Sequence, residues 1–537
     1  MIVKIIITTV YLGIIAYLGW LGYRNTKDTK DYLIGGRRIH PAIMALSYGA
    51  TFISTSAIVG FGGYAGVFGF SLLWLTFLNI FLGIFIAFVF FGKRTRRMGH
   101  NIDAHTFPEF LGKRFQSKFI QKFAGIIIFL FMPVYTAAVM IGASTFIQAN
   151  LGIDYNIALF VFAAIVAAYV FFGGLKGVMY SDAFQGTLML VGMSILIIAV
   201  YAKLGGVSAA HQKLTDLLQN PNVQEQVQGL QAGGFQGWTR MPVLFSQNWW
   251  TVVSSIVMGV GIGVLAQPQL AVRFMTVRSD RQLNRAIPVG GIFILLMTGV
   301  AFVVGALSNV LFFETTGTIS VAAAGGTDSI IPMFLDSFMP EWFVSIFLVV
   351  LLAAGMSTIS SQFHAVGTAV GRDLFNTEGK DDKKAMLISR MGVLVAIVVT
   401  IVLAYVLPTV WDGAIAISTG LFFGLCGAAF LPMYFGALYA KNMSKAAALS
   451  GMLSGFSVSA LWMLFIHSKE SVVLKLCQAL FGKPTLAPEG TMLQFVDPIV
   501  VALTVSIMVT VVVHLCTKSK FAKEHVNECF EGIGNAA

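Results

Sequence analysis

The sequence predicts an all-α polytopic membrane protein, and three observations lead to this fold class. Hydrophobic residues make up 57% of the 537-residue chain and charged residues only 11%, whereas about 25% charged residues is usual for a soluble protein. Apolar runs of roughly 20 residues recur along the chain, and helices of that length satisfy their own backbone hydrogen bonds while crossing a bilayer. Lys and Arg gather in alternate connections between these runs. We therefore expect about thirteen transmembrane helices.

The expected spans are separated by short charged or polar connections, and their boundaries are soft by several residues. They cover residues 3–23, 41–71, 73–93, 119–149, 155–173, 181–203, 247–275, 285–313, 338–373, 386–408, 412–438, 444–467 and 493–516. The first is interpreted as a retained helix. Its apolar run "VKIIITTVYLGIIAYLGWLGY" is longer than the core of a signal peptide and lacks a small-x-small cleavage site.

The distribution of Lys and Arg predicts the orientation in the membrane. If the helices alternate, the basic connections all fall on one side; they are "YRNTKDTKDYLIGGRR", "GKRTRRMGH…LGKRFQSKFIQK", "RFMTVRSDRQLNR", "RDLFNTEGKDDKKAMLISR" and "TKSKFAKEH". Residues 314–340, on the other side, contain neither Lys nor Arg. The positive-inside rule then places the N-terminus outside and the C-terminus in the cytoplasm, in a multi-pass protein of the plasma membrane. The net charge of +11 is a topology signal and predicts no nucleic-acid partner.

Two of the long spans are interrupted in a similar way. The second contains Gly49, several hydroxyl residues and then four more glycines, and the seventh contains three glycines followed by Pro268. Gly and Pro weaken a helix interior. Because the two spans lie five helices apart, they predict two inverted five-helix repeats, each opening with a discontinuous helix beside a binding site. The alternative is that the glycines only permit close helix packing.

This organisation divides the chain into five segments. They are residues 1–40 (an extra helix and a cytoplasmic loop), 41–203 (first five-helix repeat), 204–246 (an extracellular loop), 247–439 (second repeat) and 440–537 (two helices and a short cytoplasmic tail).

Hydroxyl residues form a stripe on the ninth span, within "AAGMSTISSQFHAVG". Ala354, Ser357, Thr358 and Ser361 follow i, i+3, i+4, i+7 spacing and so share one helix face, which His364 continues. Carbonyls and neutral hydroxyls supply the hard oxygen ligands that Na⁺ needs without burying many charges. One such hydroxyl is more readily explained by a bond to its own helix carbonyl. Four hydroxyls within five positions favour a cation site, and His364 has no assigned role.

Asp182 lies beside the sixth span, in "FFGGLKGVMYSDAFQG". An acidic residue there is costly unless it is paired, hydrated or bound to a cation. Capping of a helix start by Ser181 or Asp182 is an equally open interpretation.

The segment "GGLKGVMYSDAFQG" resembles the signature of the sodium/solute symporter family. The segments "GGRRIHPAIMALSYGATFIS", "AQPQLAVRFMTV" and "LLAAGMSTISSQ…GRDLF" match other landmarks of that family in the expected order. The resemblance implies the leucine-transporter fold, alternating access and coupling to Na⁺. It implies a main Na⁺ site made by the carbonyls of Ala50, Ile53 and Ala354 and the hydroxyls of Ser357 and Thr358. A second Na⁺ site, known in some members, would use Asp182, Ser357, Ser360 and Ser361.

The resemblance leaves the solute open. Members that carry proline place aromatic residues four and eight positions before the proline of the seventh helix, where this chain has Val264 and Val260. We therefore expect a Na⁺-coupled symporter that imports a small organic carboxylate, similar to pantothenate or a monocarboxylate, with proline or another amino acid as the alternative. Arg273 is as easily a positive-inside residue as a carboxylate partner, and helix-end amides are another option. The candidate substrate contacts are Thr51, Phe52, Ser54, Thr55, Tyr135 and Gln267.

Two functions of other classes compete with this interpretation. One is a proton-coupled carrier that uses Asp182 or His364, and the other is a transporter-like solute sensor, for which the short tail offers no output domain. We expect no enzyme, since no nucleophile–base constellation is present, and no ATP-driven transport, since P-loop sequences are absent. Four scattered cysteines predict neither disulfides nor zinc. The expected partners are the solute and the lipid bilayer, with no obligate protein partner.

Overall fold

The computed structural model describes residues 2–26, 29–37, 39–375, 382–488 and 490–533. Within this part of the chain, every regular element is helical. Arg38 and residues 376–381, which belong to two of the basic connections used to predict orientation, lie outside the described residues.

Most of the apolar spans form long helices. These are α1 (Ile2–Asn25), α8 (Lys118–Leu151), α9 (Tyr155–Leu204), α16 (Asp280–Thr316), α19 (Glu341–Thr368), α20 (Asp382–Val410), α21 (Ala414–Tyr439), α22 (Lys445–Phe465) and α25 (Pro498–Cys516). Other spans are built from shorter pieces, namely α3 (Pro41–Phe52) with α4 (Phe61–Phe68), α5 (Leu73–Ile80) with α6 (Lys93–Asn101), and α13 (Gln247–Trp250) with α14 (Gly259–Gly263) and α15 (Pro268–Phe274).

Short helices occupy the connections and the chain ends. They are α2 (Thr29–Ile34), α7 (Phe107–Arg114), α10 (Val207–Asp216), α11 (Pro221–Gln226), α12 (Gln228–Ala232), α17 (Ser320–Ala324), α18 (Ile330–Phe338), α23 (Ser468–Leu474), α24 (Leu476–Phe481) and α26 (Lys523–Phe530). Local signals account for several boundaries. α8, for example, begins after Ser117, whose side chain accepts from the N–H of Ile120, and ends at Gly152, which has a φ of 63°.

Eleven helices of the described residues are long and apolar enough to cross a membrane, and a shorter apolar helix covers Tyr155–Ala168. The predicted count of thirteen is not confirmed. Helical turns run from Ser56 to Asn101, but Gly69, with φ 65° and ψ −145°, interrupts them between α4 and α5, where predicted spans 41–71 and 73–93 meet. α9 covers both predicted spans 155–173 and 181–203, and its first apolar part is short.

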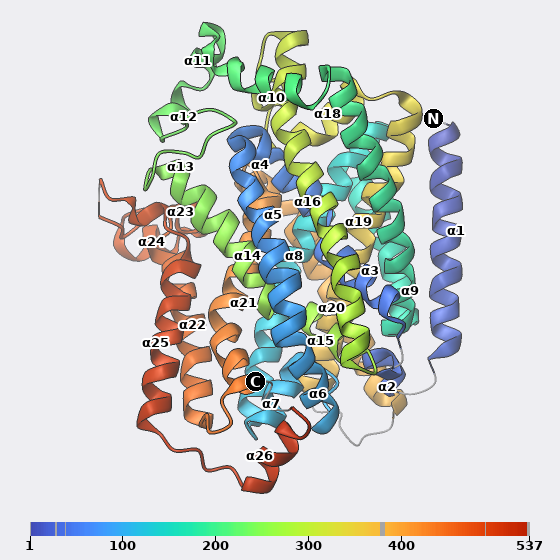
Figure 1. Ribbon diagram of the computed structural model, residues 1–537, viewed down its shortest axis with the longest axis vertical. Helices are drawn as coiled ribbons and strands as arrows, with labels where there is room; N and C mark the ends of the chain where they lie inside the picture. Colours follow the sequence, from blue (N-terminus) through green and yellow to red (C-terminus); the bar gives the residue numbers. More distant parts are fainter. Residues whose placement is uncertain (1, 27–28, 38, 376–381, 489, 534–537) are drawn as a thin grey trace.

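The helices run roughly along the long axis of the molecule, with short helices at both ends (Figure 1). We call the end that carries α10–α12 the upper end and the end that carries α2, α6, α7 and α26 the lower end. The N-terminus lies near the upper end and the C-terminus at the lower end (Figure 1). The most apolar window of α19 is 94% buried, against 22% for α1 and for α25. α19 is therefore a central helix, while α1 and α25 lie at opposite edges (Figure 1).

Close packing explains some of the glycines in the interrupted spans. A Cβ atom on Gly305 of α16 would overlap the carbonyl oxygen of Gly62 in α4, and one on Gly63 would overlap the carbonyl oxygen of Thr327. These glycines thus allow α4 to contact its neighbours through backbone. Close packing therefore explains the glycines of α4, whereas the predicted interruption of the span lies before them, at residues 53–54.

Candidate ion-binding site

The first interrupted span breaks in the middle of the molecule. α3 ends at Phe52, and Ile53 takes an extended conformation with φ −93° and ψ 107°. The N–H of Ala57 donates to the carbonyl of Ser54 at 3.0 Å, so the usual helical bond to the carbonyl of Ile53 is replaced. Carbonyl groups at the end of α3 therefore need partners from outside their own helix.

Hydroxyl groups of α19 provide these partners. The Ser357 hydroxyl donates to the carbonyl of Ala50 at 2.9 Å and lies 3.2 Å from that of Ala354. The Thr358 hydroxyl lies 3.1 Å from the carbonyl of Thr51 and 3.3 Å from that of Ala50. All five residues are buried. We call these five oxygens, three carbonyl and two hydroxyl, the neutral oxygen cluster.

The chemistry of the neutral oxygen cluster suits Na⁺. Oxygen atoms are the ligands of hard cations, and unwound helix ends supply them in secondary transporters. The structure brings together Ala50, Ala354, Ser357 and Thr358 of the five residues predicted for the main Na⁺ site. Ile53 lies at the break itself. The carbonyl of Thr51 is an additional oxygen beyond those predicted.

A second group of polar side chains lies on the other side of Thr51. The Asp182 carboxylate oxygen Oδ2 accepts a hydrogen bond from the Ser47 hydroxyl at 2.8 Å and lies 3.0 Å from an Nη2 atom of Arg273. The hydroxyl oxygens of Thr51 and Ser361 are 2.5 and 2.6 Å from the same nitrogen. We call Ser47, Thr51, Asp182, Arg273 and Ser361 the charged cluster. It joins α3, α9, α15 and α19 in the buried interior.

The residues predicted for a second Na⁺ site divide between different environments. Asp182 and Ser361 belong to the charged cluster, whereas Ser357 belongs to the neutral oxygen cluster. The Ser360 hydroxyl donates to the carbonyl of Ser357, in its own helix, at 3.0 Å. Asp182 lies well inside α9, so it does not cap a helix start, and Ser181 donates to the carbonyl of Gly177 in the same helix.

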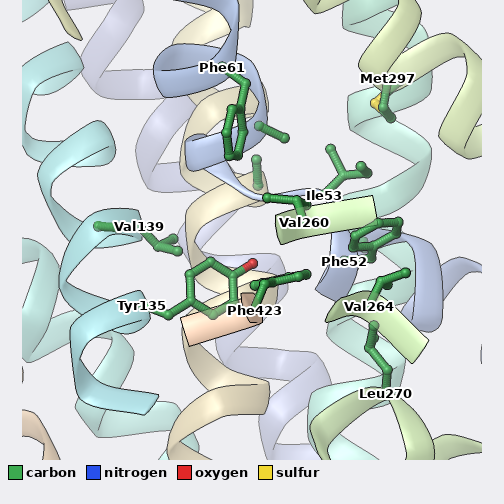
Figure 2. Close-up of a cluster of buried hydrophobic side chains, with 14 of the residues drawn as sticks. Phe52, Ile53, Phe61, Tyr135, Val139, Val260, Val264, Leu270, Met297 and Phe423 are labelled. Carbon is green, nitrogen blue, oxygen red and sulfur yellow. The ribbon is translucent and has the colours of Figure 1, made fainter. Parts of the chain in front are cut away.

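Four of the six predicted substrate contacts lie at or beside the two helix breaks. Phe52 and Tyr135 belong to a buried apolar cluster with Val260, Val264 and Phe423 (Figure 2). The Tyr135 hydroxyl also interacts with the Ser54 side chain. Gln267, at the second break, takes φ −72° and ψ 117° and is fully buried. This region combines a large apolar surface with a few polar groups, as small-molecule sites do.

The other two predicted substrate contacts have structural partners. The Thr55 hydroxyl donates to the carbonyl of Val139 in α8 at 2.6 Å, and the Thr51 hydroxyl lies in the charged cluster. His364 is buried, with Nε2 3.5 Å from the carbonyl oxygen of Leu33 and its ring beside that of Tyr32. His364 thus packs between α19 and α2.

Sequence reasoning missed the role of Arg273. The residue follows the uncharged stretch "AQPQLAV", and it is only 1% exposed in the structure. A buried guanidinium needs an acceptor, preferably an anion. Asp182 was the carboxylate already identified beside an apolar span. Pairing these two residues was therefore the signal that could have found the charged cluster.

The lower end holds an ion-pair network that ties α7 to the residues after α19. Glu109 is buried, and its carboxylate lies 2.9 Å from Nη2 of Arg372 and 2.8 Å from Nζ of Lys113. Burial alone would raise the pKa of Glu109, but hydrogen bonds from His105 and Arg372 and the charges of Arg372 and Lys113 hold that pKa well below its ordinary value. A cavity lined by Arg273, Ser361 and His364 also reaches His105 of this network.

The chain matches known proteins over most of its length. The family model described as sodium:solute symporter family matches residues 32–455. The osmoregulated proline transporter OpuE of Bacillus subtilis is 28% identical over 483 residues, which is 89% of this chain and 92% of that protein. The sodium/proline symporter 2 of Staphylococcus saprophyticus is 28% identical over 502 residues, 90% of this chain and 89% of that protein.

Solved structures of transporters share the fold. The substrate-bound, outward-open structure of a Na⁺-coupled sialic acid symporter superposes with a TM-score of 0.75 at 17% identity, covering 97% of this chain and 99% of that one. The structure of MHP1, a nucleobase-cation-symport-1 family transporter, gives a TM-score of 0.50 at 13% identity over 93% of this chain and 97% of that one. These likenesses confirm the predicted all-α fold of the leucine-transporter type.

Proposed function

The chain belongs to the sodium:solute symporter family, and from that premise we propose that it imports a small carboxylate with an apolar body together with Na⁺. Na⁺ is the coupling ion of the family, and the relatives are transporters, not enzymes. Na⁺ binds the neutral oxygen cluster from outside and joins α3 to α19. This binding favours the state that accepts the solute from outside, and the protein then exposes both to the cytoplasm by alternating access.

The observation that carries the proposal is the position of the neutral oxygen cluster at the broken end of α3. Its oxygens come from two helices. A cation bound between them therefore has a higher affinity for states in which α3 and α19 stay together than for states in which they separate. Differential affinity is what couples ion and solute, and the coupling is reciprocal. A membrane potential of 100 mV adds about 2.3 kcal/mol of driving force for each Na⁺ carried inward.

Two valines support a carboxylate with an apolar body. Val260 and Val264 line the buried apolar cluster beside Phe52 and Tyr135 (Figure 2). Both side chains are aliphatic and smaller than the aromatic rings that proline-carrying members place at these positions. Arg273 is engaged by Asp182, so the solute carboxylate meets neutral polar groups and the charge of the bound Na⁺. Attraction between the two opposite charges in a low-dielectric site links their binding.

Proline is the second candidate solute. The observation in its favour is that both relatives described above are proline transporters, at 28% identity over nearly the whole chain. Proline also carries a carboxylate and a compact apolar ring, so it satisfies the same polar groups.

Uptake into proteoliposomes tests both candidates. Labelled pantothenate, pyruvate and L-proline are supplied with and without an inward Na⁺ gradient. We expect the gradient to accelerate uptake of pantothenate or pyruvate about tenfold, and excess unlabelled proline to compete weakly. Uptake of proline alone would replace the first candidate by the second. If the Na⁺ gradient accelerates uptake of none of the three solutes and the protein binds no Na⁺, the proposed function is wrong.

A variant sharpens the choice between the solutes. Val264→Phe enlarges a buried side chain of the apolar cluster and is expected to reduce uptake of pantothenate, the bulkiest of the three solutes, more than that of proline. Val393→Phe is the control for overpacking, because it makes the same change at a buried position of α20 that packs beside Gly367 of α19. An equal loss of both solutes in the two variants would show that the effect is only steric damage.

We also propose the orientation and the repeat boundaries. The lower end is assigned to the cytoplasm because the basic residues of α6 and α7 lie there (Figure 1). Residues 41–203 and 247–439 are assigned to the two repeats because each range begins at or near an interrupted helix. Cys516 is exposed at the end of α25, so a membrane-impermeant maleimide should label it only in inside-out vesicles.

A further inference from the structure

Arg273 lies against Asp182, the carboxylate that the family resemblance implies for a second Na⁺ site. We propose that the guanidinium of Arg273 occupies this cation position as a tethered charge, so that the chain binds and carries one Na⁺ per solute. The inference rests on the proposed function, because it specifies how many ions the same transporter couples.

The surroundings of one Arg273 nitrogen resemble the oxygen shell of a cation. Its Nη2 atom lies 2.5 Å from the Thr51 hydroxyl oxygen, 2.6 Å from that of Ser361 and 3.0 Å from Asp182 Oδ2. An NH₂ group has only two hydrogens, so it donates directly to at most two of these three oxygens. The remaining oxygen interacts with the positive charge, as a ligand of a metal ion does. The oxygens come from α3, α9 and α19. A Na⁺ ion held by Asp182 and Ser361 would need two of the same three atoms.

The other two nitrogens hold the guanidinium in place. Nε of Arg273 donates to the Ser47 hydroxyl at 3.0 Å, and Nη1 donates to the carbonyl of Gln269 at 2.6 Å. Each of the three nitrogens therefore has an acceptor. An arginine side chain does not lose its proton in proteins, so the positive charge is permanent. A Na⁺ ion at the same oxygens would face a like charge within hydrogen-bonding distance, which disfavours its binding.

Asp182 retains the capacity to bind an ion if Arg273 is removed. The residue is fully buried, and its second oxygen, Oδ1, makes no hydrogen bond within the described part of the chain. Without the guanidinium, Asp182 Oδ2 and the hydroxyls of Thr51 and Ser361 would face the space that Nη2 now fills. A buried carboxylate without a cation is costly in a membrane protein, so Na⁺ would be drawn to it.

Thr51 connects the tethered charge to the neutral oxygen cluster. Its hydroxyl contacts Arg273, while its carbonyl oxygen lies 3.1 Å from the Thr358 hydroxyl. The Ser361 hydroxyl, which also contacts Arg273, donates to the carbonyl of Ser357 at 3.0 Å. Arg273 thus acts as a positioning residue for the end of α3 and for α19. If a second Na⁺ held α3 and α19 in place of Arg273, these contacts would form and break each time that ion bound and left.

The test counts Na⁺ ions on the purified protein by equilibrium binding of ²²Na⁺. We expect one ion per chain in the wild type. We expect two in Arg273→Gln, with the Hill coefficient for Na⁺ rising from about 1 toward about 2. Arg273→Lys keeps a tethered charge and should bind one. The double variant Arg273→Gln/Asp182→Asn, which removes both charges, should also bind one.

Specific results overturn the inference. A wild type that binds two ions, or an Arg273→Gln variant that still binds one, shows that the guanidinium does not take the place of an ion. So does an Arg273→Lys variant that binds two. If the variants do not fold, the wild-type count decides alone. A wild type that binds no Na⁺ overturns the proposed function itself, whereas a count of two overturns only the present inference.

Discussion

The neutral oxygen cluster and the charged cluster lie on the two sides of Thr51 and share the helices α3 and α19. The first contains only carbonyl and hydroxyl oxygens, while the second contains a carboxylate and a guanidinium 3.0 Å apart. The oxygens of the first cluster satisfy one another through hydrogen bonds, whereas the second cluster balances two opposite charges within the chain. A stripe of hydroxyls on one helix face therefore does not by itself define how many ions it binds.

The largest effect is expected when the balance of the charged cluster is broken. Asp182→Asn leaves the Arg273 charge buried without its anion, and breaking a buried pair costs about 3–5 kcal/mol. The free energy of unfolding, measured by SDS titration in mixed micelles, should fall accordingly. Arg273→Gln/Asp182→Asn should recover most of the loss because no unpaired charge remains. A double variant that is as unstable as Asp182→Asn alone would contradict the ion-pair interpretation.

The neutral oxygen cluster should respond in ion affinity. Ser357→Ala/Thr358→Ala removes two hydroxyl oxygens, and if each contributes about 1.5 kcal/mol to holding a charged partner, Na⁺ affinity falls about 100-fold. The Na⁺ dependence of uptake and ²²Na⁺ binding measure this. Ser360→Ala is the matched control, because that hydroxyl donates to its own helix carbonyl. Unchanged Na⁺ dependence in the double variant would exclude this site.

The lower-end network extends the comparison to a charged group outside the membrane. Glu109 has a pKa below its ordinary value, so its contribution to stability is present above about pH 4.3, the usual pKa of Glu, and is lost as pH falls further toward the folded-state pKa. Glu109→Gln replaces hydrogen bonds to a charged group, each contributing about 1.5–3 kcal/mol, by weaker neutral ones, and should cost about 2 kcal/mol at pH 7. The difference in Tm between wild type and variant should shrink below about pH 4. A difference that stays constant from neutral to acidic pH would contradict the assignment.

The smallest effect is expected for a single hydroxyl of the charged cluster. Ser361→Ala removes one acceptor of Arg273, and interhelical hydrogen bonds in membrane proteins contribute about 0.6 kcal/mol on average. Unfolding should become easier by roughly that amount, and Ser360→Ala should change less. Na⁺ affinity at the neutral oxygen cluster should stay within about threefold, a change smaller than the loss of one hydrogen bond. A large loss of Na⁺ affinity in Ser361→Ala would assign that hydroxyl to the ion.

The fold class and the main polar residues were predictable because they depend on local pattern. Apolar run length predicted membrane helices, and Gly and Pro placement predicted the two interrupted spans, whose breaks the structure places at residues 53–54 and at Gln267. The count of thirteen helices is not confirmed. α9 covers two of the predicted spans, and how such a segment is divided depends on the packing of neighbouring helices, which run length does not report.

The order of residues identifies the groups that have to be satisfied in a membrane: the hydroxyl stripe of α19, the freed carbonyls of α3 and the carboxylate of Asp182. Which partner satisfies each of them is settled only when the helices pack. Arg273 is 91 positions from Asp182 in the chain, yet the two side chains meet, and Thr51 contacts both clusters through different atoms. This is so because a buried charge or carbonyl requires a partner but does not specify it. The packing of α3, α9, α15 and α19 makes that choice.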